Sequence, residues 1–412
     1  MRVASSEAAS SGSGVDLDRY GAPELRARAG AKWSSVGPDG LAAGLADMDF
    51  PLAPAVRDAL IDAVRRDDLG YPSPRLAESC RQAFARRYAE RHGLEVDPGC
   101  VVLTSDVVQA IYAAVWSLTA EGDGVVFLTP SYPPFFDAVR ETRRRVLTAD
   151  LVAGPSGYEL DLERLGDLVA RERPRCLLLC NPHNPTGRAF RREELAALGA
   201  LACEHDLLVV ADEIHADLVL PGASHVPIAS LDAEVARRCV TLSSASKAFN
   251  VAGLRCAFAA FPSRDLLEAF DVLPAAIRGS VSVAGMHATL AAFSAGDAWL
   301  DAVLRRLAVN RAEVVRALGS LAGVRVHPPE ATYLAWLDLR AAGLGDDPAE
   351  VIARRSGVVC SSGPSFGPAG RGHVRLNFAT SAPVLEEICR RVAAVIRSSA
   401  PSSASRSDRG GA

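Results

Sequence analysis

One lysine in the chain has neighbours that could support covalent chemistry. Of the 45 residues that are lysine or arginine, only Lys32 and Lys247 are lysines. A primary amine can lose its proton and condense with a carbonyl, which a guanidinium does not do. Lys247 follows a strand-like run, and Ser244, Ser246 and Arg255 are close to it in the sequence. Because hydroxyls and a guanidinium form an anion site, we expect a reactive amine beside a phosphate. The alternative is an ordinary surface lysine after a strand.

Other polar residues also follow apolar runs. Asp212 follows the run 207–211, and Asn184 lies just after the run 175–180. A carboxylate at the carboxyl end of a parallel strand is where an open α/β sheet holds its ligands. Asp106 lies between a strand-like run and a helical pattern, where unpaired N–H groups and the helix dipole can bind a phosphate.

Apolar runs of four to six residues, each followed by turn residues and a helical pattern, recur between residues 101 and 261. Continuous rather than alternating apolar runs indicate a sheet that is buried on both faces, with mainly parallel strands. After residue 261 the pattern changes to helices, including 299–318, and strands at 331–338 and 372–378, which predicts a smaller α+β domain. The polar ends, 1–14 and 398–412, are predicted to be disordered.

The composition excludes several classes of protein. A net charge of −4 shows no basic excess, so we expect no nucleic-acid partner. Nine scattered cysteines have neither disulfide-framework nor metal-site spacing, and we expect reduced core thiols and no metal. The chain lacks an apolar run of about 18 residues and the apolar centre of a signal peptide, so we expect a cytoplasmic protein without membrane contact.

Three strings together resemble a known superfamily: Ser244-Ala-Ser-Lys247 with Arg255, Asn181-Pro-His-Asn-Pro-Thr-Gly-Arg188, and Ala46-Asp-Met-Asp-Phe50. They are similar to the pyridoxal-phosphate enzymes of fold type I, the aminotransferase class I/II superfamily, and to its cystathionine β-lyase (C–S lyase) branch. The resemblance implies an α/β large domain with a mainly parallel seven-stranded sheet, over residues 51–280. It also implies a small α+β domain over 281–397, joined by an N-terminal arm over 15–50.

The resemblance also implies how pyridoxal 5'-phosphate is bound. Lys247 would carry it as a Schiff base. The phosphate would be held by the following residues: Asp106, Val107, Ser244, Ser246, Arg255, and Tyr71 from the neighbouring subunit of a homodimer. Tyr132 would stack on the ring, Asp212 would keep the ring nitrogen protonated, and Asn184 and His215 would lie near the ring oxygen.

A small amino-acid substrate would be bound through its carboxylate by Ala46 N–H, Asn184 and Arg375. Two positions depart from the family pattern. Gly44 stands near the place of a usual tryptophan, which affects the shape of the substrate pocket. Asp106 replaces a usual glycine, and a carboxylate there repels phosphate unless the side chain turns away to cap the helix. For Asp47 or Asp49, capping of a helix N-terminus is an alternative to a role in the site.

The function that follows from the resemblance is β-elimination from a cysteine S-conjugate such as cystathionine, giving a thiol, pyruvate and ammonia. An aminotransferase shares the early steps and is the first alternative. A second alternative is a pathway-specific enzyme that acts on a larger S-conjugate or amino acid. A third, of a different class, is a binding or regulatory protein that keeps the fold without activity.

Overall fold

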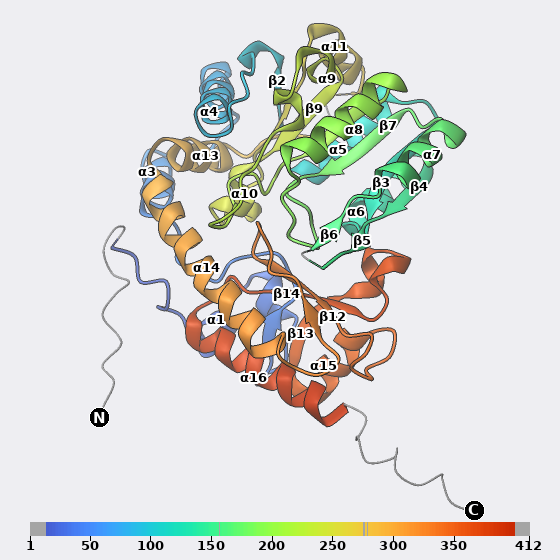
Figure 1. Ribbon diagram of the computed structural model, residues 1–412. Helices are drawn as coiled ribbons and strands as arrows, with labels where there is room; N and C mark the ends of the chain where they lie inside the picture. Colours follow the sequence, from blue (N-terminus) through green and yellow to red (C-terminus); the bar gives the residue numbers. More distant parts are fainter. Residues whose placement is uncertain (1–13, 156, 275–276, 278, 400–412) are drawn as a thin grey trace, which may run out of the picture.

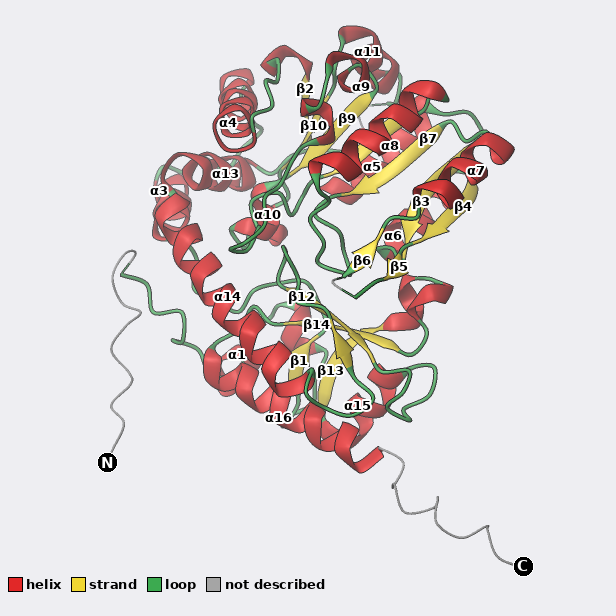
Figure 2. Ribbon diagram, viewed as in Figure 1, coloured by secondary structure: helices red, strands yellow, loops and turns green. Residues whose placement is uncertain are grey.

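The computed structural model describes residues 14–155, 157–274, 277 and 279–399. It contains two main sheets, drawn above and below one another in Figure 1 and marked as yellow arrows in Figure 2. Residues 1–13 and 400–412, which make up nearly all of the two predicted tails, lie outside the described part.

The larger sheet has seven strands in the order β2-β10-β9-β8-β7-β3-β4. All neighbouring pairs are parallel except those of β10, which is antiparallel to both β2 and β9. The strands are β2 (Val101–Thr104), β3 (Gly124–Thr129), β4 (Arg145–Asp150), β7 (Cys176–Cys180), β8 (Leu208–Asp212), β9 (Cys239–Ser243) and β10 (Ala257–Ala260). This arrangement confirms the predicted fold class.

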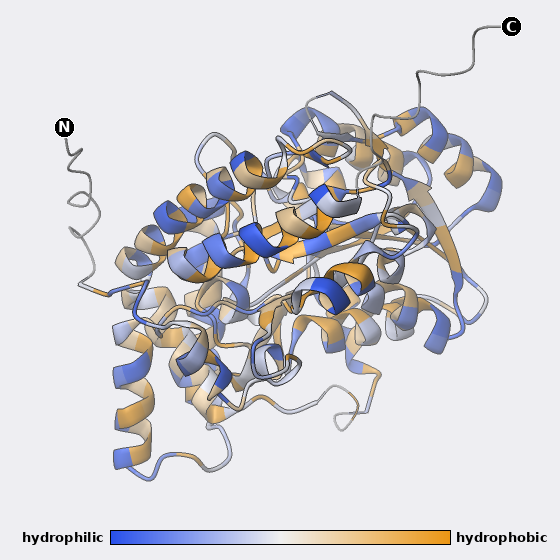
Figure 3. Ribbon diagram, turned by 90° about the horizontal axis from the view of Figure 1, so that it is seen from below, coloured by the Kyte–Doolittle hydropathy of each residue, from blue (hydrophilic) through white to orange (hydrophobic). Residues whose placement is uncertain are grey.

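Helices cover both faces of this sheet, as the continuous apolar runs predict. In β7, Leu178 packs into the core under α5, α6 and α11, whereas Leu177 and Leu179 pack into the core under α7, α8 and α9. The helices are α5 (Val107–Leu118), α6 (Pro133–Glu141), α7 (Leu162–Glu172), α8 (Arg192–Glu204), α9 (Ala233–Ala236) and α11 (Arg264–Asp271). Figure 3 shows hydrophilic and hydrophobic residues interleaved along the helices, which is typical of helices with one buried face.

The smaller sheet has the order β1-β13-β14-β12-β11 and combines the two ends of the chain, because β1 pairs in parallel with β13. Its strands are β1 (Leu41–Ala43), β11 (Arg325–Val326), β12 (Leu334–Asp338), β13 (Val358–Ser362) and β14 (His373–Asn377). The associated helices are α1 (Ala22–Arg26), α2 (Ala31–Ser34), α14 (Asp297–Leu318), α15 (Pro348–Ser356) and α16 (Ala382–Ser399).

The prediction placed the start of the C-terminal tail at residue 398, but α16 includes Ser398 and Ser399. Both hydroxyls donate to Val395 O, which supplies a partner for a carbonyl near the helix end.

Helices α13 (Val283–Ala295) and α14 connect the regions of the two sheets. Helix α13 packs against α3 (Pro54–Arg65) and α4 (Pro74–His92), and α14 continues from it to the smaller sheet (Figure 1). The boundary between the large and the small domain, which we expect between residues 280 and 281, stays a prediction. The remaining elements are short: β5 (Val152–Ala153), β6 (Tyr158–Glu159) and α10 (Ala245–Ala248), with 3-10 turns at Pro98–Cys100, Ile228–Ser230, Ala252–Leu254, Gly363–Phe366 and Pro368–Gly370.

Within the described residues, no helix combines the length and apolarity needed to span a membrane. The nine cysteines are free thiols, and eight of them are buried.

Candidate active site

Lys247 lies in the short helix α10, directly after strand β9. Ser244 is the N-cap of this helix: its hydroxyl accepts a hydrogen bond from Ser246 N at 3.0 Å and donates to Cys256 O at 2.7 Å. The turn directs the Lys247 side chain toward the N-terminal arm, where Nζ donates to Ala46 O at 2.8 Å. The lysine is therefore held between the two sheets and is not an ordinary surface residue.

Burial and the charged groups around Lys247 set its protonation. Burial lowers the pKa of Lys247, the Asp47 and Asp212 carboxylates act in the opposite direction, and the Arg375 guanidinium adds to the effect of burial. Burial also raises the pKa of Asp212 to about 7, against a hydrogen bond from Ile214 N and the nearby lysine. A lysine with a lowered pKa beside a carboxyl with a raised pKa is typical of sites that move protons.

Both Nη atoms of Arg375, on β14, have hydrogen-bond partners. Its Nη1 donates to Asn184 Oδ1 at 3.0 Å, and its Nη2 donates to Gly44 O and to Ser361 Oγ, both at 3.0 Å. Its Nε is buried and has no hydrogen-bond partner in the described part of the chain. The guanidinium is thus fixed in place and retains a donor for a ligand.

Gly44 allows the arm to approach β13 closely. A Cβ atom at this position would lie 3.1 Å from the backbone carbon of Cys360, closer than most side chains tolerate. The glycine therefore brings Gly44 O within reach of Arg375 and of Ser361 Oγ, which donates at 2.9 Å. The missing side chain at position 44 thus allows the close approach of the two backbones.

The segment Gly44–Met48, which we call the strap, separates the two sheets and has every carbonyl bonded to a side chain. The donors are Arg375 and Ser361 to Gly44 O, Asn377 to Leu45 O and Asp47 O, Lys247 and Tyr333 to Ala46 O, Lys32 to Asp47 O, and Asn250 to Met48 O. These donors come from the smaller sheet and Tyr333 beside it, from α10 and the residues after it, and from the arm itself. The strap is therefore a fixed wall of the site.

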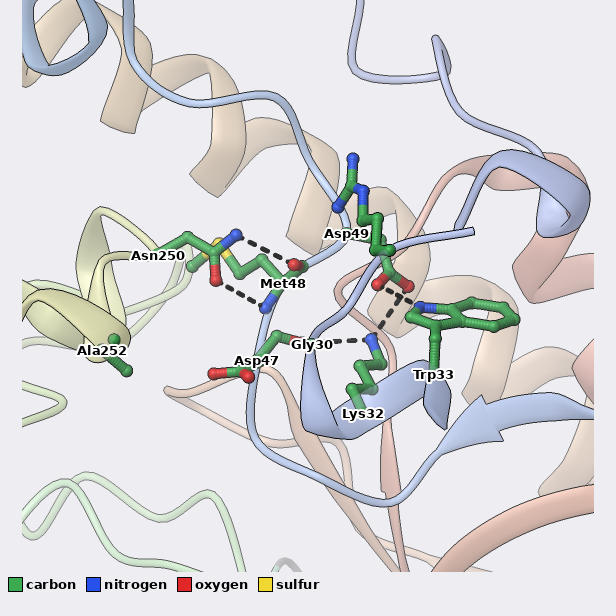
Figure 4. Close-up of a pocket in the computed structure, with 10 residues that line it drawn as sticks. Gly30, Lys32, Trp33, Asp47, Met48, Asp49, Asn250 and Ala252 are labelled. Carbon is green, nitrogen blue, oxygen red and sulfur yellow. Dashed lines mark hydrogen bonds and ion pairs between the residues drawn. The ribbon is translucent and has the colours of Figure 1, made fainter. Parts of the chain in front are cut away.

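Lys32 and Asp49 fasten the strap from its other side. Lys32 Nζ lies 2.8 Å from Asp49 Oδ2, and Trp33 Nε1 donates to Asp49 Oδ1 at 2.7 Å. Figure 4 shows these contacts beside a cavity of about 190 Å³, with the Asp47 carboxylate on the side away from Lys32. The alternative that Asp47 or Asp49 caps a helix is wrong, because the next helix, α3, has Ala53 as its N-cap.

Three of the predicted phosphate residues, Asp106, Val107 and Arg255, lie at the N-terminus of α5, whereas Ser244 and Ser246 lie at the start of α10. Asp106 is the N-cap, and its Oδ1 accepts a hydrogen bond from Gln109 N at 2.8 Å, as capping requires. Its other oxygen, Oδ2, forms an ion pair with Arg255 Nη1 at 2.5 Å. The side chain thus caps the helix, and its second oxygen still contacts Arg255. Val107 begins the helix and is buried.

Three further predicted residues take different places. Tyr132 is half-buried near Arg375, Asp212 and Asp106, whose charges all influence its raised pKa, although burial is the main cause. His215 is buried, which lowers its pKa to about 3, and its Nδ1 has no hydrogen-bond partner among the described residues. Tyr71 is fully exposed on the surface of the chain.

Sequence reasoning missed several residues of the site. Tyr333 is buried, its hydroxyl donates to Ala46 O at 2.8 Å, and its ring meets that of His215 edge-on. Asn250, close after Lys247, and Asn377, close after Arg375, both hold the strap. Their position next to those residues was the available signal.

A mainly parallel seven-stranded sheet, with a buried aspartate at the end of one strand and a buried lysine after the next, is the architecture of an enzyme that works through a carbonyl cofactor. The model of the family "Aminotransferase class I and II" matches residues 40–392. The chain belongs to this family.

Individual relatives are similar over nearly the whole chain. The chain is 35% identical to cystathionine beta-lyase PatB of Bacillus subtilis (strain 168), over 89% of this chain and 96% of the relative. It is 34% identical to cystathionine beta-lyase of Corynebacterium glutamicum, over 90% of this chain and 98% of the relative. The structure of the PLP-bound C-S lyase from Staphylococcus hominis matches with a TM-score of 0.85 and 27% identity, covering 92% of this chain and 98% of that one.

Proposed function

We propose that the protein is a pyridoxal-phosphate-dependent C–S lyase that acts on a cysteine S-conjugate by β-elimination. The observation that carries the proposal is the enclosed Lys247 amine, which lies near the carboxylates of Asp212 and Asp47 and the fixed guanidinium of Arg375. Relatives named as cystathionine β-lyases, similar over nine-tenths of the chain, support the choice of reaction.

The residues fit the cofactor. Asp212 is buried with a pKa raised to about 7, and a protonated ring nitrogen beside it would supply the missing positive charge. Tyr132 offers an aromatic face for stacking, and the N-terminus of α5 with Arg255 offers donors for a phosphate. A polar group of the bound cofactor would give a hydrogen-bond partner to Nδ1 of His215, which is buried and has none among the described residues.

When bound, pyridoxal phosphate supplies an aldehyde that joins amines covalently and an electron-poor ring that accepts the electrons released at the substrate's α-carbon. Arg375 binds the substrate carboxylate, because its guanidinium is held by Asn184 and Gly44 and keeps Nε free. The neutral amine of Lys247 removes the α-proton, and burial favours this neutral form because it lowers the pKa of the amine.

Elimination then breaks the bond between the β-carbon and sulfur. The electron pair left by the α-proton forms the new carbon–carbon double bond, and the sulfur leaves with the electrons of its own bond. The ammonium of Lys247 holds the removed proton and can pass it to the thiolate, which restores the neutral amine. Water converts the remaining three-carbon fragment to pyruvate and ammonia.

The direct test is pyruvate release from cystathionine and from a simple S-alkyl cysteine by the purified protein with saturating pyridoxal phosphate. We expect pyruvate and thiol in equal amounts, with no added keto acid. Lys247→Arg keeps the positive charge but removes the reactive amine, and it should abolish the product. Cofactor-loaded protein that releases no pyruvate from either substrate would contradict the lyase assignment.

Transamination is the second candidate, because the family includes aminotransferases and the same residues serve both reactions up to proton removal. It differs in its need for a second keto acid. Amino-group transfer from an unsubstituted amino acid, together with absence of thiol release from S-conjugates, would favour it.

We further propose that the active unit is a homodimer in which Tyr71 of each chain reaches the phosphate of the other. Tyr71 is fully exposed in the single chain, and Leu69 nearby is about half exposed, 52%. Exposed apolar residues near each other are common at subunit contacts. Mixing Tyr71→Phe and Lys247→Arg chains should restore one full site per mixed dimer, and light scattering should give twice the mass of one chain.

A further inference from the structure

The phosphate site proposed above already contains a carboxylate of the protein itself. One oxygen of Asp106 accepts a hydrogen bond from Gln109 N at 2.8 Å, and the other lies 2.5 Å from Arg255 Nη1. The side chain thus contacts both parts of the site that would bind a phosphate, the helix N-terminus and the arginine. These are the same groups that a phosphate needs as donors.

Both partners are held by the backbone. Asp106 cannot leave without uncapping α5, because its Oδ1 is the cap acceptor. Arg255 has a left-handed backbone, with φ of 54°, and its carbonyl accepts a hydrogen bond from Ser282 N at 3.2 Å. The side chains remain partly open to solvent, Arg255 60% and Asp106 33% exposed. An ion pair this exposed contributes little by itself, so a phosphate can displace it. The cap nevertheless keeps the carboxylate charge within the site.

We propose that Asp106 is an internal counter-anion of the phosphate site, which weakens the binding of the cofactor's phosphate by repelling it and by sharing Arg255. This inference rests on the proposed function. Its consequence is that the cofactor leaves the protein more readily than it would with a neutral residue at this position. Asp106 is therefore a residue that sets cofactor affinity, while Lys247 carries the chemistry.

The chain offers a closely matched pair of variants. Asp106→Asn keeps an oxygen that can accept from Gln109 N and removes the charge next to Arg255. Asp161→Asn makes the same chemical change at another N-cap, because Asp161 Oδ1 accepts a hydrogen bond from Arg164 N at 3.0 Å at the start of α7. Any effect of losing one capping charge in general should appear in both variants.

The measurement is the dissociation constant of full-length protein, freed of cofactor, for two aldehydes: pyridoxal phosphate and pyridoxal, which lacks the phosphate. Absorbance of the lysine adduct reports binding of each. We expect Asp106→Asn to bind pyridoxal phosphate about tenfold or more tightly than the unaltered protein, since one like charge is removed beside a dianion. Its affinity for pyridoxal should stay the same. Inorganic phosphate, used as a competitor of pyridoxal phosphate, should show a lower inhibition constant with the variant than with the unaltered protein. Asp161→Asn should change neither aldehyde's affinity.

Two results would overturn the inference. If Asp106→Asn binds pyridoxal phosphate as well as, or less well than, the unaltered protein, then the carboxylate does not oppose the phosphate and instead orients Arg255 for it. If the variant binds both aldehydes more tightly by the same factor, the effect does not involve the phosphate. Failure of the proposed function gives a different outcome: neither aldehyde forms an adduct with the unaltered protein, or Lys247→Arg forms the same adduct.

Discussion

Replacing Lys32 by methionine should destabilise the protein, although Lys32 is not one of the proposed catalytic groups. Lys32 and Asp49 are only 4% and 3% exposed, and their charged atoms lie 2.8 Å apart. Removing one partner of a buried ion pair leaves the other charge unpaired, which costs about 3–5 kcal/mol. Trp33 Nε1 still donates to Asp49 Oδ1 in the variant, so we expect a loss near the lower end, about 3 kcal/mol.

Denaturation by guanidinium chloride, followed by tryptophan fluorescence, measures this loss. The double variant Lys32→Met with Asp49→Asn removes both charges and should recover about half of the loss or more. Lys32→Arg keeps the positive charge, and the neighbouring cavity leaves room for the larger guanidinium, so it should cost less than Lys32→Met. Equal stability of Lys32→Met and the unaltered protein, or a double variant less stable than the single one, would show that this pair does not hold the strap.

Three other predictions concern the site. Asp47→Asn removes a carboxylate that raises the pKa of Lys247, so the amine of the cofactor-free protein should react with pyridoxal at lower pH than before; an unchanged pH profile would contradict this. The folded cofactor-free protein keeps a proton on Asp212 up to about pH 7, whereas an unfolded chain loses it near pH 4. Stability from this group therefore falls as pH rises through that window, and Asp212→Asn should flatten the fall in urea titrations at several pH values. Tyr333→Phe deletes one hydrogen bond to Ala46 O and should lower kcat about two- to tenfold with little change in KM; a change confined to KM would refute a role after binding.

Local sequence patterns predicted the larger sheet well, because each buried strand is a short apolar run with its own turn residues. The run 175–180 became β7, and the run 207–211 became β8 shifted by one residue. The antiparallel direction of β10 has no such signal, since Ala257–Ala260 is as apolar as its parallel neighbours. The pairing of β1 with β13 is also invisible locally, because the partners are more than 300 residues apart in the sequence.

The residues with side-chain chemistry could be named from the sequence, but the contacts of the strap could not. The acceptors in the strap are backbone carbonyls, which every residue has, so the sequence shows no pattern for them. The bond from Tyr333 to Ala46 spans 287 positions, and the bond from Asp106 to Arg255 spans 149. Such contacts depend on how the two sheets and the arm meet. Lys32 is the clearest case, since its rarity as a lysine was visible while its buried partner Asp49 was not.

The central claim is that the Lys247 amine holds the cofactor, and the most direct test is reduction of the loaded protein with borohydride followed by peptide mass spectrometry. We expect one pyridoxyl group per chain, on the peptide that contains Lys247, with Lys32 unmodified. A reduced protein that carries the group elsewhere, or carries none while the cofactor is demonstrably bound, would contradict the claim.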